Sequence, residues 1–319
     1  SEPEVRAMVD FMVKHPNIGA AISYHTHSGV ILRPLATHAD DEMIPEDLWA
    51  YKRFSALGEK LTGYPAISIF HDFKYHPKEV ITGTQDWVYE HLGAYFWVVE
   101  IWAPNKEAGI TDYKWVDWYR DHPLEDDLKL MKWNDEVLKK KGFVPWKPFN
   151  HPQLGRVEIG GWDWLHMWTN PPLNFLEKEI APFPDWIVWH ALISPRLTLH
   201  SADVFPAGKD AYRVRLVVQN TGWLPSYVTK KALDKKFTRG VVAEIALPRG
   251  AALQSGKLRE ELGQLEGRAY HSAFTDDYEG MTSDRLKMEW VVHAPKGGTV
   301  KLSARHERAG VVRVSLKLK

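Results

Sequence analysis

The first 145 residues alternate between two hydrophobic patterns. Apolar residues three or four positions apart, from Val5 to Val13, predict a helix that Pro16 ends, and a similar pattern predicts a helix over residues 45–60. Short apolar runs predict buried strands at residues 18–22, 66–70 and 94–100. The last run is almost continuously apolar, which is typical of a strand buried on both faces.

The last third of the chain shows a period of two instead. Apolar and polar residues alternate, with glycine-containing turns nearby, over residues 212–219, 287–293, 300–304 and 312–319. Alternation of this kind is typical of antiparallel strands with one buried face. The spacing predicts an immunoglobulin-like β-sandwich in residues 196–319.

Residues 125–195 join these two patterns. A helix is predicted over residues 125–140 because its first turn is acidic and its last turn is basic, and Leu130, Trp133 and Val137 are expected to face the domain. Residues 146–195 are dense in Pro and Trp, and we interpret them as a connector. Its tryptophans could stack on a ligand, but burial by packing is the expected role.

Charge and cysteine content exclude several classes of function. Lys+Arg and Asp+Glu each number 41, so the formal net charge is 0, and nothing steers the protein towards nucleic acid or an anionic surface. No run of about 18 apolar residues occurs, so no membrane span is expected. Without cysteine, neither a disulfide framework nor a thiolate ligand or nucleophile is available. The compartment stays open among cytoplasm, periplasm and exterior, with the last two slightly favoured. Ser1 follows no initiator Met, so we expect the chain to begin inside a longer gene product.

Two places in the first hundred residues carry candidate chemistry. His25 and His27 follow the strand predicted at residues 18–22, and imidazole is the commonest zinc ligand. Because a zinc site needs at least three protein ligands, metal binding and a hydrogen-bonded pair remain alternatives. Glu100 ends the strand predicted at residues 94–100. A carboxylate there is either paired with Arg or Lys at the rim of the sheet or acts as a general base whose pKa is tuned by burial.

Three stretches in order resemble the C-terminal half of a zinc carboxypeptidase of the carboxypeptidase A/B (funnelin) type. They are the helix at residues 1–13 leading into residues 22–28, the Gly-Thr-Gln-Asp-Trp segment at residues 83–87, and the strand at residues 95–100. The resemblance implies that His25 is the third zinc ligand, His27 lines the site and Glu100 is the catalytic base. It also implies that Gln85 and Asp86 border the specificity pocket. Residues 1–145 then form this half domain, residues 146–195 the connector and residues 196–319 an accessory β-sandwich.

The chain also departs from that family. The His-x-x-Glu motif that supplies the first two zinc ligands should lie well upstream of His25, and none precedes it. The strings at residues 76–79 and 122–125 follow His25 and contain Pro, so we treat them as chance matches. An ungapped match places Lys78 where the family has a mobile substrate-binding Tyr, so Tyr75 serves only with a local shift. Gln85 is a neutral amide and indicates no side-chain preference.

Two functions therefore compete. The first is a zinc-dependent metallocarboxypeptidase that hydrolyses the C-terminal bond of a peptide or cell-wall peptide, with Glu100 taking the proton of a zinc-bound water. In this interpretation the missing N-terminal half of the catalytic domain supplies the other ligands, and this chain alone is predicted to hold zinc weakly or not at all and to be inactive. The alternative is a non-catalytic binding or structural protein on a carboxypeptidase scaffold.

Overall fold

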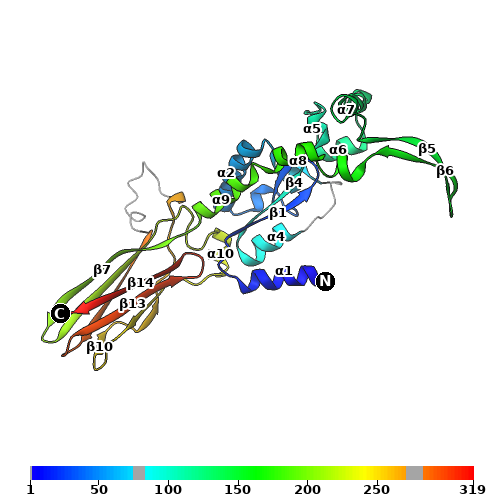
Figure 1. Cartoon of the computed structure of the whole chain (residues 1–319). Coiled ribbons are helices and arrows are strands. Elements are labelled where there is room, and N and C mark those ends of the chain that lie inside the picture. Colours follow the sequence, from blue (N-terminus) through cyan, green and yellow to red (C-terminus); the bar gives the residue numbers. More distant parts are fainter. Residues whose placement is uncertain (1, 75–82, 271–282) are drawn as a thin grey trace. The chain divides into compact units, whose positions relative to one another are not determined.

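Figure 1 shows the computed structural model, which describes residues 2–74, 83–270 and 283–319. The chain divides into two compact units that interleave along the sequence. We call residues 22–87 and 96–187 the sheet unit, and residues 1–21, 88–95 and 188–319 the sandwich unit. The predicted domain limits at residues 145 and 195 divide the chain into consecutive segments, whereas these units are each made of several segments. The predicted limits remain a prediction.

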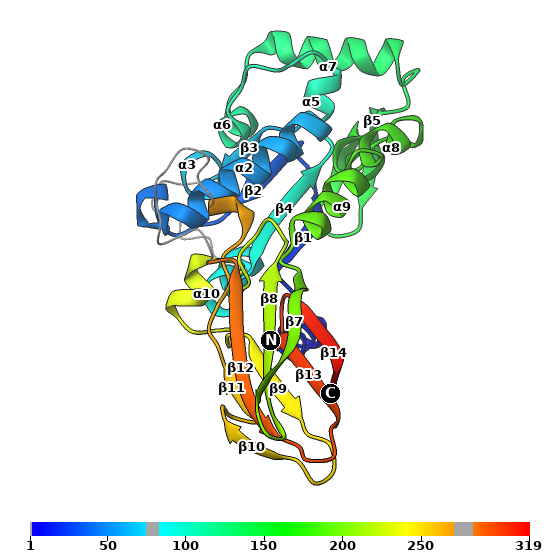
Figure 2. The same cartoon turned by 90° about the vertical axis from the view of Figure 1, so that its left-hand side faces the viewer.

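The sheet unit is built on a four-stranded sheet in the order β1-β4-β2-β3 (Figure 2). Strand β2 is antiparallel to β4 and parallel to β3. The strands are β1 (Ala20–Thr26), β2 (Val30–Arg33), β3 (Ala66–Ser68) and β4 (Tyr95–Ile101), the first residues of β1 and β4 being counted with the sandwich unit. The helices of this unit are η1 (Asp40–Glu42), α2 (Pro45–Thr62), α3 (Ile69–Asp72), α4 (Thr84–Trp87), α5 (Pro104–Glu107), α6 (Trp115–Arg120), α7 (Leu124–Glu136), η3 (Trp164–Trp168), α8 (Leu173–Ile180) and the start of α9 (Phe183–Ile193).

The predicted buried strand at residues 94–100 is confirmed as β4. Its residues from Tyr95 to Val99 are buried. Trp97 has no exposed surface, lies edge-on to Tyr51 and Trp186, and donates its indole N–H to Ser55 Oγ at 3.0 Å. The polar atom of this large ring is therefore satisfied inside the core, as burial requires.

Strand β1 differs from the prediction of a buried strand. It is the outer strand of the sheet, its first four residues are half-buried and its last three are exposed. An edge strand has a neighbouring strand on one side only, so its apolar side chains are less buried than those of a central strand.

Several helix limits also differ, and side-chain hydrogen bonds explain them. The strand predicted to Phe70 stops at Ser68, whose Oγ accepts from His71 N at 3.4 Å and caps α3. Helix α7 ends at Glu136 instead of residue 140 because Asn134 Oδ1 accepts from Gly142 N at 2.8 Å. Val137, expected to face the domain, is 44% exposed.

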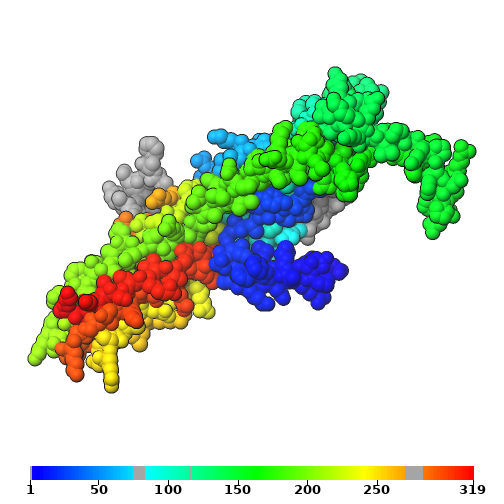
Figure 3. Space-filling model, viewed as in Figure 1, coloured from blue at the N-terminus to red at the C-terminus, as the bar shows by residue number. Residues whose placement is uncertain are grey.

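The predicted connector contains regular structure. Strands β5 (Phe143–His151) and β6 (Gly155–Trp162) form an antiparallel hairpin that projects from the rest of its unit (Figure 3). Its Trp146 is 60% exposed, and so is Trp164 in η3. The expectation that packing buries these tryptophans is therefore wrong for both, although Trp168 and Trp186 are buried.

The sandwich unit contains two four-stranded sheets, ordered β10-β12-β8-β7 and β11-β9-β13-β14, with antiparallel pairing between the neighbours. One hydrophobic cluster joins them, with Val214 and Trp290 from the first sheet and Leu302 from the second. The pair of sheets is thus sandwich-like, and the immunoglobulin-like topology remains a prediction. The strands are β7 (Leu197–Gly208), β8 (Ala211–Asn220), β9 (Val242–Ala246), β10 (Ala252–Ser255), β11 (Arg259–Glu261), β12 (Arg285–His293), β13 (Gly298–His306) and β14 (Gly310–Leu318), and the helices are α1 (Pro3–Lys14), η2 (Val88–Leu92), α10 (Lys230–Asp234) and η4 (Arg268–Tyr270).

Helix α1 confirms the predicted helix but not a core role. Val5, Met8 and Val13 of its apolar stripe are exposed, and only Met12 is buried. Glu2 is its N-cap residue and makes no capping hydrogen bond through its side chain. No helix in the described ranges is long and apolar enough to cross a membrane.

Arg308, in the turn between β13 and β14, ties three segments of the sandwich unit together. Its guanidinium donates to the carbonyl oxygens of Leu92 at 2.5 Å, Gly93 at 2.8 Å, Tyr227 at 2.9 Å and Pro16 at 3.3 Å. Burial lowers the pKa of Arg308 to about 10, which still leaves it charged at neutral pH. Fixed peptide carbonyls thus provide the solvation that water would otherwise give this cation.

Replacing Arg308 with Met should destabilise the protein. The methionine cannot donate to these carbonyls, so we expect a loss of about 2–3 kcal/mol in the free energy of unfolding, measured by urea denaturation. Arg313→Met, on the exposed face of β14, is the matched control and should change stability by less than about 0.5 kcal/mol. Equal effects of the two variants would contradict this role of Arg308.

Candidate functional site

The C-terminal ends of β1 and β4 and the start of β2 lie on the same side of the sheet. We call this side, where the strands end, the edge of the sheet. Ser28, between β1 and β2, donates its N–H to Trp102 O at 2.8 Å, just past the end of β4. Strand β2 then begins with Val30 opposite Glu100 and runs antiparallel to β4. Because only three residues separate the end of β1 from the start of β2, β1 must also end at this edge. His25, His27 and Glu100 therefore share one edge.

Glu100 is a half-buried carboxylate. Burial raises its pKa from 4.5 to about 7. Within the described ranges no Arg, Lys or His forms an ion pair with it, and burial is the one cause of its raised pKa. A carboxyl group that titrates near neutrality can both accept and return a proton, which is the property of a general base.

His25 lies exposed near the end of β1. Its Nε2 is 2.9 Å from Ser23 Oγ, so one ring nitrogen is engaged by a hydroxyl. A zinc ion needs at least three protein ligands, and within the described ranges no three His, Asp or Glu side chains gather in a way that could hold a metal ion. The residues present therefore supply one candidate ligand and do not fit a zinc site by themselves.

His27 is enclosed by aromatic rings. The hydroxyl of Tyr119 and Nδ1 of His27 are 3.1 Å apart, and the rings of Tyr119 and Trp164 lie edge-on to the imidazole with centroids 5.7 and 5.5 Å away. Burial lowers the pKa of His27. His27 thus lines the edge as an aromatic residue. The sequence reasoning missed Tyr119 and Trp164, whose only signal was the density of aromatic residues around them.

Gln85 and Asp86, which the resemblance implies border the specificity pocket, lie in α4. Gln85 and Asp86 are buried, with 6% and 8% of their surface exposed, and Asp86 Oδ1 accepts from Ala36 N at 3.0 Å. The Asp86 side chain thus holds the loop after β2 from inside the unit. Tyr75 lies outside the described residues, as do Lys78 and the string at residues 76–79. His122, in the other string, stacks on Trp118 and contacts Asp127 at 3.3 Å.

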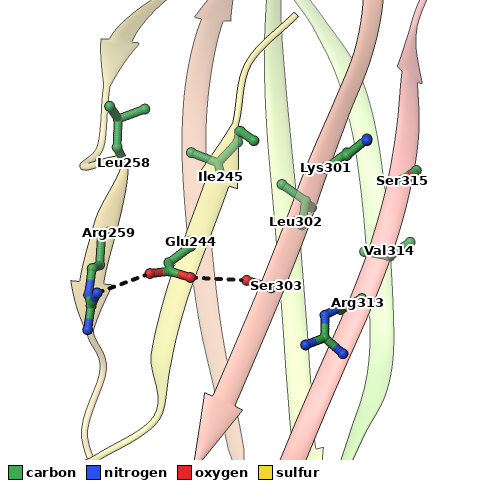
Figure 4. Close-up of a pocket in the computed structure, with 11 residues that line it drawn as sticks. Glu244, Ile245, Leu258, Arg259, Lys301, Leu302, Ser303, Arg313, Val314 and Ser315 are labelled. Atoms are coloured by element: carbon green, nitrogen blue, oxygen red, sulfur yellow. Dashed lines mark hydrogen bonds and ion pairs between the residues drawn. The ribbon is translucent and has the colours of Figure 1, made fainter.

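Two cavities of the described chain have linings that do not include the residues of this edge. One, of about 650 Å³, is a groove on the outer face of the sheet that contains β9 and β13 (Figure 4). Glu244 at its centre pairs with Arg259 at 3.4 Å and accepts from Ser303 Oγ at 3.4 Å. Another, of about 570 Å³, lies between the end of α7 and the start of α8. Neither includes His25 or Glu100.

Family comparison separates the two ends of the chain. Residues 1–111 match the zinc carboxypeptidase family, Peptidase M14. This match supports the resemblance found in the sequence and covers His25, His27 and Glu100. Residues 196–317 match a domain of unknown function, DUF8731. No curated protein matches this chain.

Solved structures give weak similarities. They include β-glucuronidase of Parabacteroides merdae (13% identity, TM-score 0.18), the β-glucosidase DesR of Streptomyces venezuelae (10%, 0.19) and β-glucosidase 3B of Thermotoga neapolitana (12%, 0.20). Each covers 39% of this chain, which spans only 12%, 15% and 16% of their lengths. Similarity at this level does not bear on function.

The raised pKa of Glu100 predicts a pH-dependent stability. The folded state holds a proton on Glu100 up to about pH 7, whereas the unfolded chain releases it near 4.5. Between these values the folded state binds more protons, so this group's contribution to stability falls as pH rises and is fully lost above about pH 7. Glu100→Gln should therefore raise the melting temperature at pH 8 but not at pH 4. Exposed Glu46→Gln is the control, and an equal shift in both variants would contradict the assignment.

Proposed function

We propose that this chain provides the base and one metal ligand of a zinc-dependent metallocarboxypeptidase. Glu100 carries the proposal, because it is a half-buried carboxylate with a pKa of about 7 at the edge of the sheet where His25 also lies. The match of residues 1–111 to the zinc carboxypeptidase family supports it independently. The substrate is a peptide or cell-wall peptide, from which the enzyme removes the C-terminal residue.

The role of Glu100 is proton transfer. In its ionised form it accepts a proton from the water that attacks the scissile carbonyl, and as a neutral acid it protonates the leaving amine. Burial serves both steps because it brings the pKa of the carboxyl group close to neutral pH. A general base of this type contributes about 10²–10⁴-fold to the rate.

The metal requires residues beyond those described. His25 is one imidazole, and the protein needs at least two further ligands to hold zinc at this edge. We infer that a His-x-x-Glu motif N-terminal to Ser1 in the native gene product supplies them. Residues 196–319 carry no role in the chemistry under this proposal and stabilise or dock the catalytic part.

The alternative is a non-catalytic binding or structural protein built on the same scaffold. The lack of a three-residue metal group within the described ranges favours it. The coding sequence upstream of Ser1 distinguishes the two. A His-x-x-Glu motif with Arg between it and His25 favours the enzyme, whereas an initiator Met directly before Ser1 excludes it.

The 319-residue chain should bind zinc weakly. A single imidazole does not retain the ion through purification, so elemental analysis after gel filtration should find well under one equivalent, and the chain should show no carboxypeptidase activity. A full equivalent of tightly bound zinc would contradict this and would indicate a ligand set other than the one proposed.

In the native protein, Glu100→Gln should abolish turnover while zinc stays bound. The amide keeps the size of the side chain but cannot accept the proton, so we expect kcat to fall by about 10²–10⁴-fold with unchanged metal content. Glu46→Gln on α2 should leave both quantities unchanged. Retained turnover in Glu100→Gln would remove Glu100 from this role.

A further inference from the structure

We propose that the outer face of β13 and β14 binds a linear acidic polysaccharide whose sugars each carry a carboxylate. We call the residues of this face the cation–hydroxyl ladder. The ladder consists of three directly opposite pairs, each of one cation and one hydroxyl, and a further cation beyond them: Lys317 with Thr299, Lys301 with Ser315, Arg313 with Ser303, and then Arg305. It lies in the sandwich unit and does not depend on the chemistry proposed for Glu100.

The hydrophobic core fixes which face of the strands carries the ladder. Val300 and Leu302 of β13 alternate with ladder residues and belong to the buried cluster that joins the two sheets, as do Val312 and Leu318 of β14. A shift of either strand by one residue would bury the cations and expose this core. The ladder is therefore turned to solvent, and all its residues are exposed except Ser303, which is half-buried.

The cation changes strand at every step along the ladder. Lys317 lies on β14, Lys301 on β13, Arg313 on β14 and Arg305 on β13. Successive cations are thus diagonal neighbours, which in an antiparallel pair lie about 7–8 Å apart. A polymer whose acid groups point alternately to the two sides of its axis matches this arrangement. β-Linked polyuronates have this form, because each sugar is turned over relative to the one before it.

Three of the four cations have no acidic partner. In the part of the chain that the structure describes, Lys301, Arg313 and Lys317 form no ion pair, and Arg305 alone lies near an acid, 3.8 Å from the Glu244 carboxylate. The face thus carries a local positive charge although the whole chain has a formal net charge of 0. Like charges at this spacing repel one another. A bound polyanion would remove that repulsion.

Protection of a strand edge does not account for the ladder. Lysines on an edge strand hinder its pairing with another chain, and β14 is an outer strand of its sheet. Lys301 and Arg305, however, lie on β13, which pairs with β14 on one side and with β9 on the other. A bound polyanion accounts for the cations of both strands.

The middle of the ladder lines the groove of about 650 Å³ on this face (Figure 4). Lys301 and Ser303 come from β13, and Arg313 and Ser315 from β14. A guanidinium can bind a carboxylate through two N–H groups, and an ammonium can bind it as a point charge. Serine hydroxyls both donate and accept, as sugar hydroxyls do. The groove therefore offers partners for the two kinds of group that a uronate presents.

The residues of this face favour an acidic sugar polymer over other polyanions. None of the side chains that β9, β11, β13 and β14 turn to it is aromatic. The bases of a single-stranded nucleic acid would therefore find no ring on which to stack. An inorganic polyphosphate has no hydroxyl groups, whereas a uronate sugar presents hydroxyls beside its carboxylate and matches both members of each pair.

The test measures the binding of a β-linked mannuronate hexamer to the full 319-residue chain by isothermal titration calorimetry. The hexamer should bind, and added salt should weaken it because the charges are screened. Cellohexaose, a β-linked glucose hexamer without carboxylates, should not bind detectably. Neither zinc nor turnover is needed, so failure of Glu100→Gln to stop turnover would defeat the proposed function and leave this result standing.

Substitutions within the ladder identify the site. Lys301→Gln combined with Arg313→Gln should weaken hexamer binding by about tenfold or more, because two charge-assisted contacts are lost. Arg285→Gln combined with Lys287→Gln removes the same charge from β12 in the other sheet and should leave the affinity unchanged. Ser315→Ala should weaken binding by about threefold through the loss of a neutral hydrogen bond. All five side chains are exposed, so the melting temperatures should stay close to that of the unsubstituted protein.

Three results would overturn the inference. Equal losses in the two double variants would mean that only the net charge of the protein matters. Tighter binding of a polyphosphate or an oligothymidylate of the same charge would assign the face to another polyanion. A hexamer that does not bind even at low salt would leave the ladder as surface charge alone.

Discussion

The candidate site depends on the burial of β4. The strand is covered on both faces and flanked by β1 and β2, and the core satisfies the one polar atom of Trp97 through Ser55. The pairing of β4 with β2, in which Val30 lies opposite Glu100, and the hydrogen bond of Trp97 hold the strand in one register. Its last residues therefore emerge at a defined place, and Glu100 is one of them. The same burial that orders the strand raises the pKa of this carboxyl group.

The edge of the sheet holds a candidate general base but too few candidate metal ligands. It holds a carboxylate tuned to neutral pH beside a surface of aromatic rings, but it presents a single imidazole for metal binding. Tyr119 and Trp164 reach the edge from α6 and η3, so segments on both sides of α7 contribute to it. An activity that needs zinc would have to complete the ligand set from residues other than those described.

Sequence patterns predicted the elements whose signals are local and strong. The continuous apolar run became β4, the amphipathic pattern with Pro at its start and Gly63 at its end became α2, and the alternating residues became β8, β12, β13 and β14. Element ends were less predictable, because the hydrogen bonds that decide them join residues several positions apart. Asn134 to Gly142 is one such bond, and no period in the sequence encodes it.

The candidate site divides in the same way. Glu100 and His25 stand in short motifs at the ends of predicted strands, so the sequence by itself singled them out as candidates. Only the tertiary structure decided that β1 is an edge strand, that Gln85 and Asp86 are buried and that the rings of Tyr119 and Trp164 lie against His27. The physical reason is that strand order, burial and ring contacts arise from the packing of segments far apart in the chain. Local composition and spacing report only what each segment can do alone.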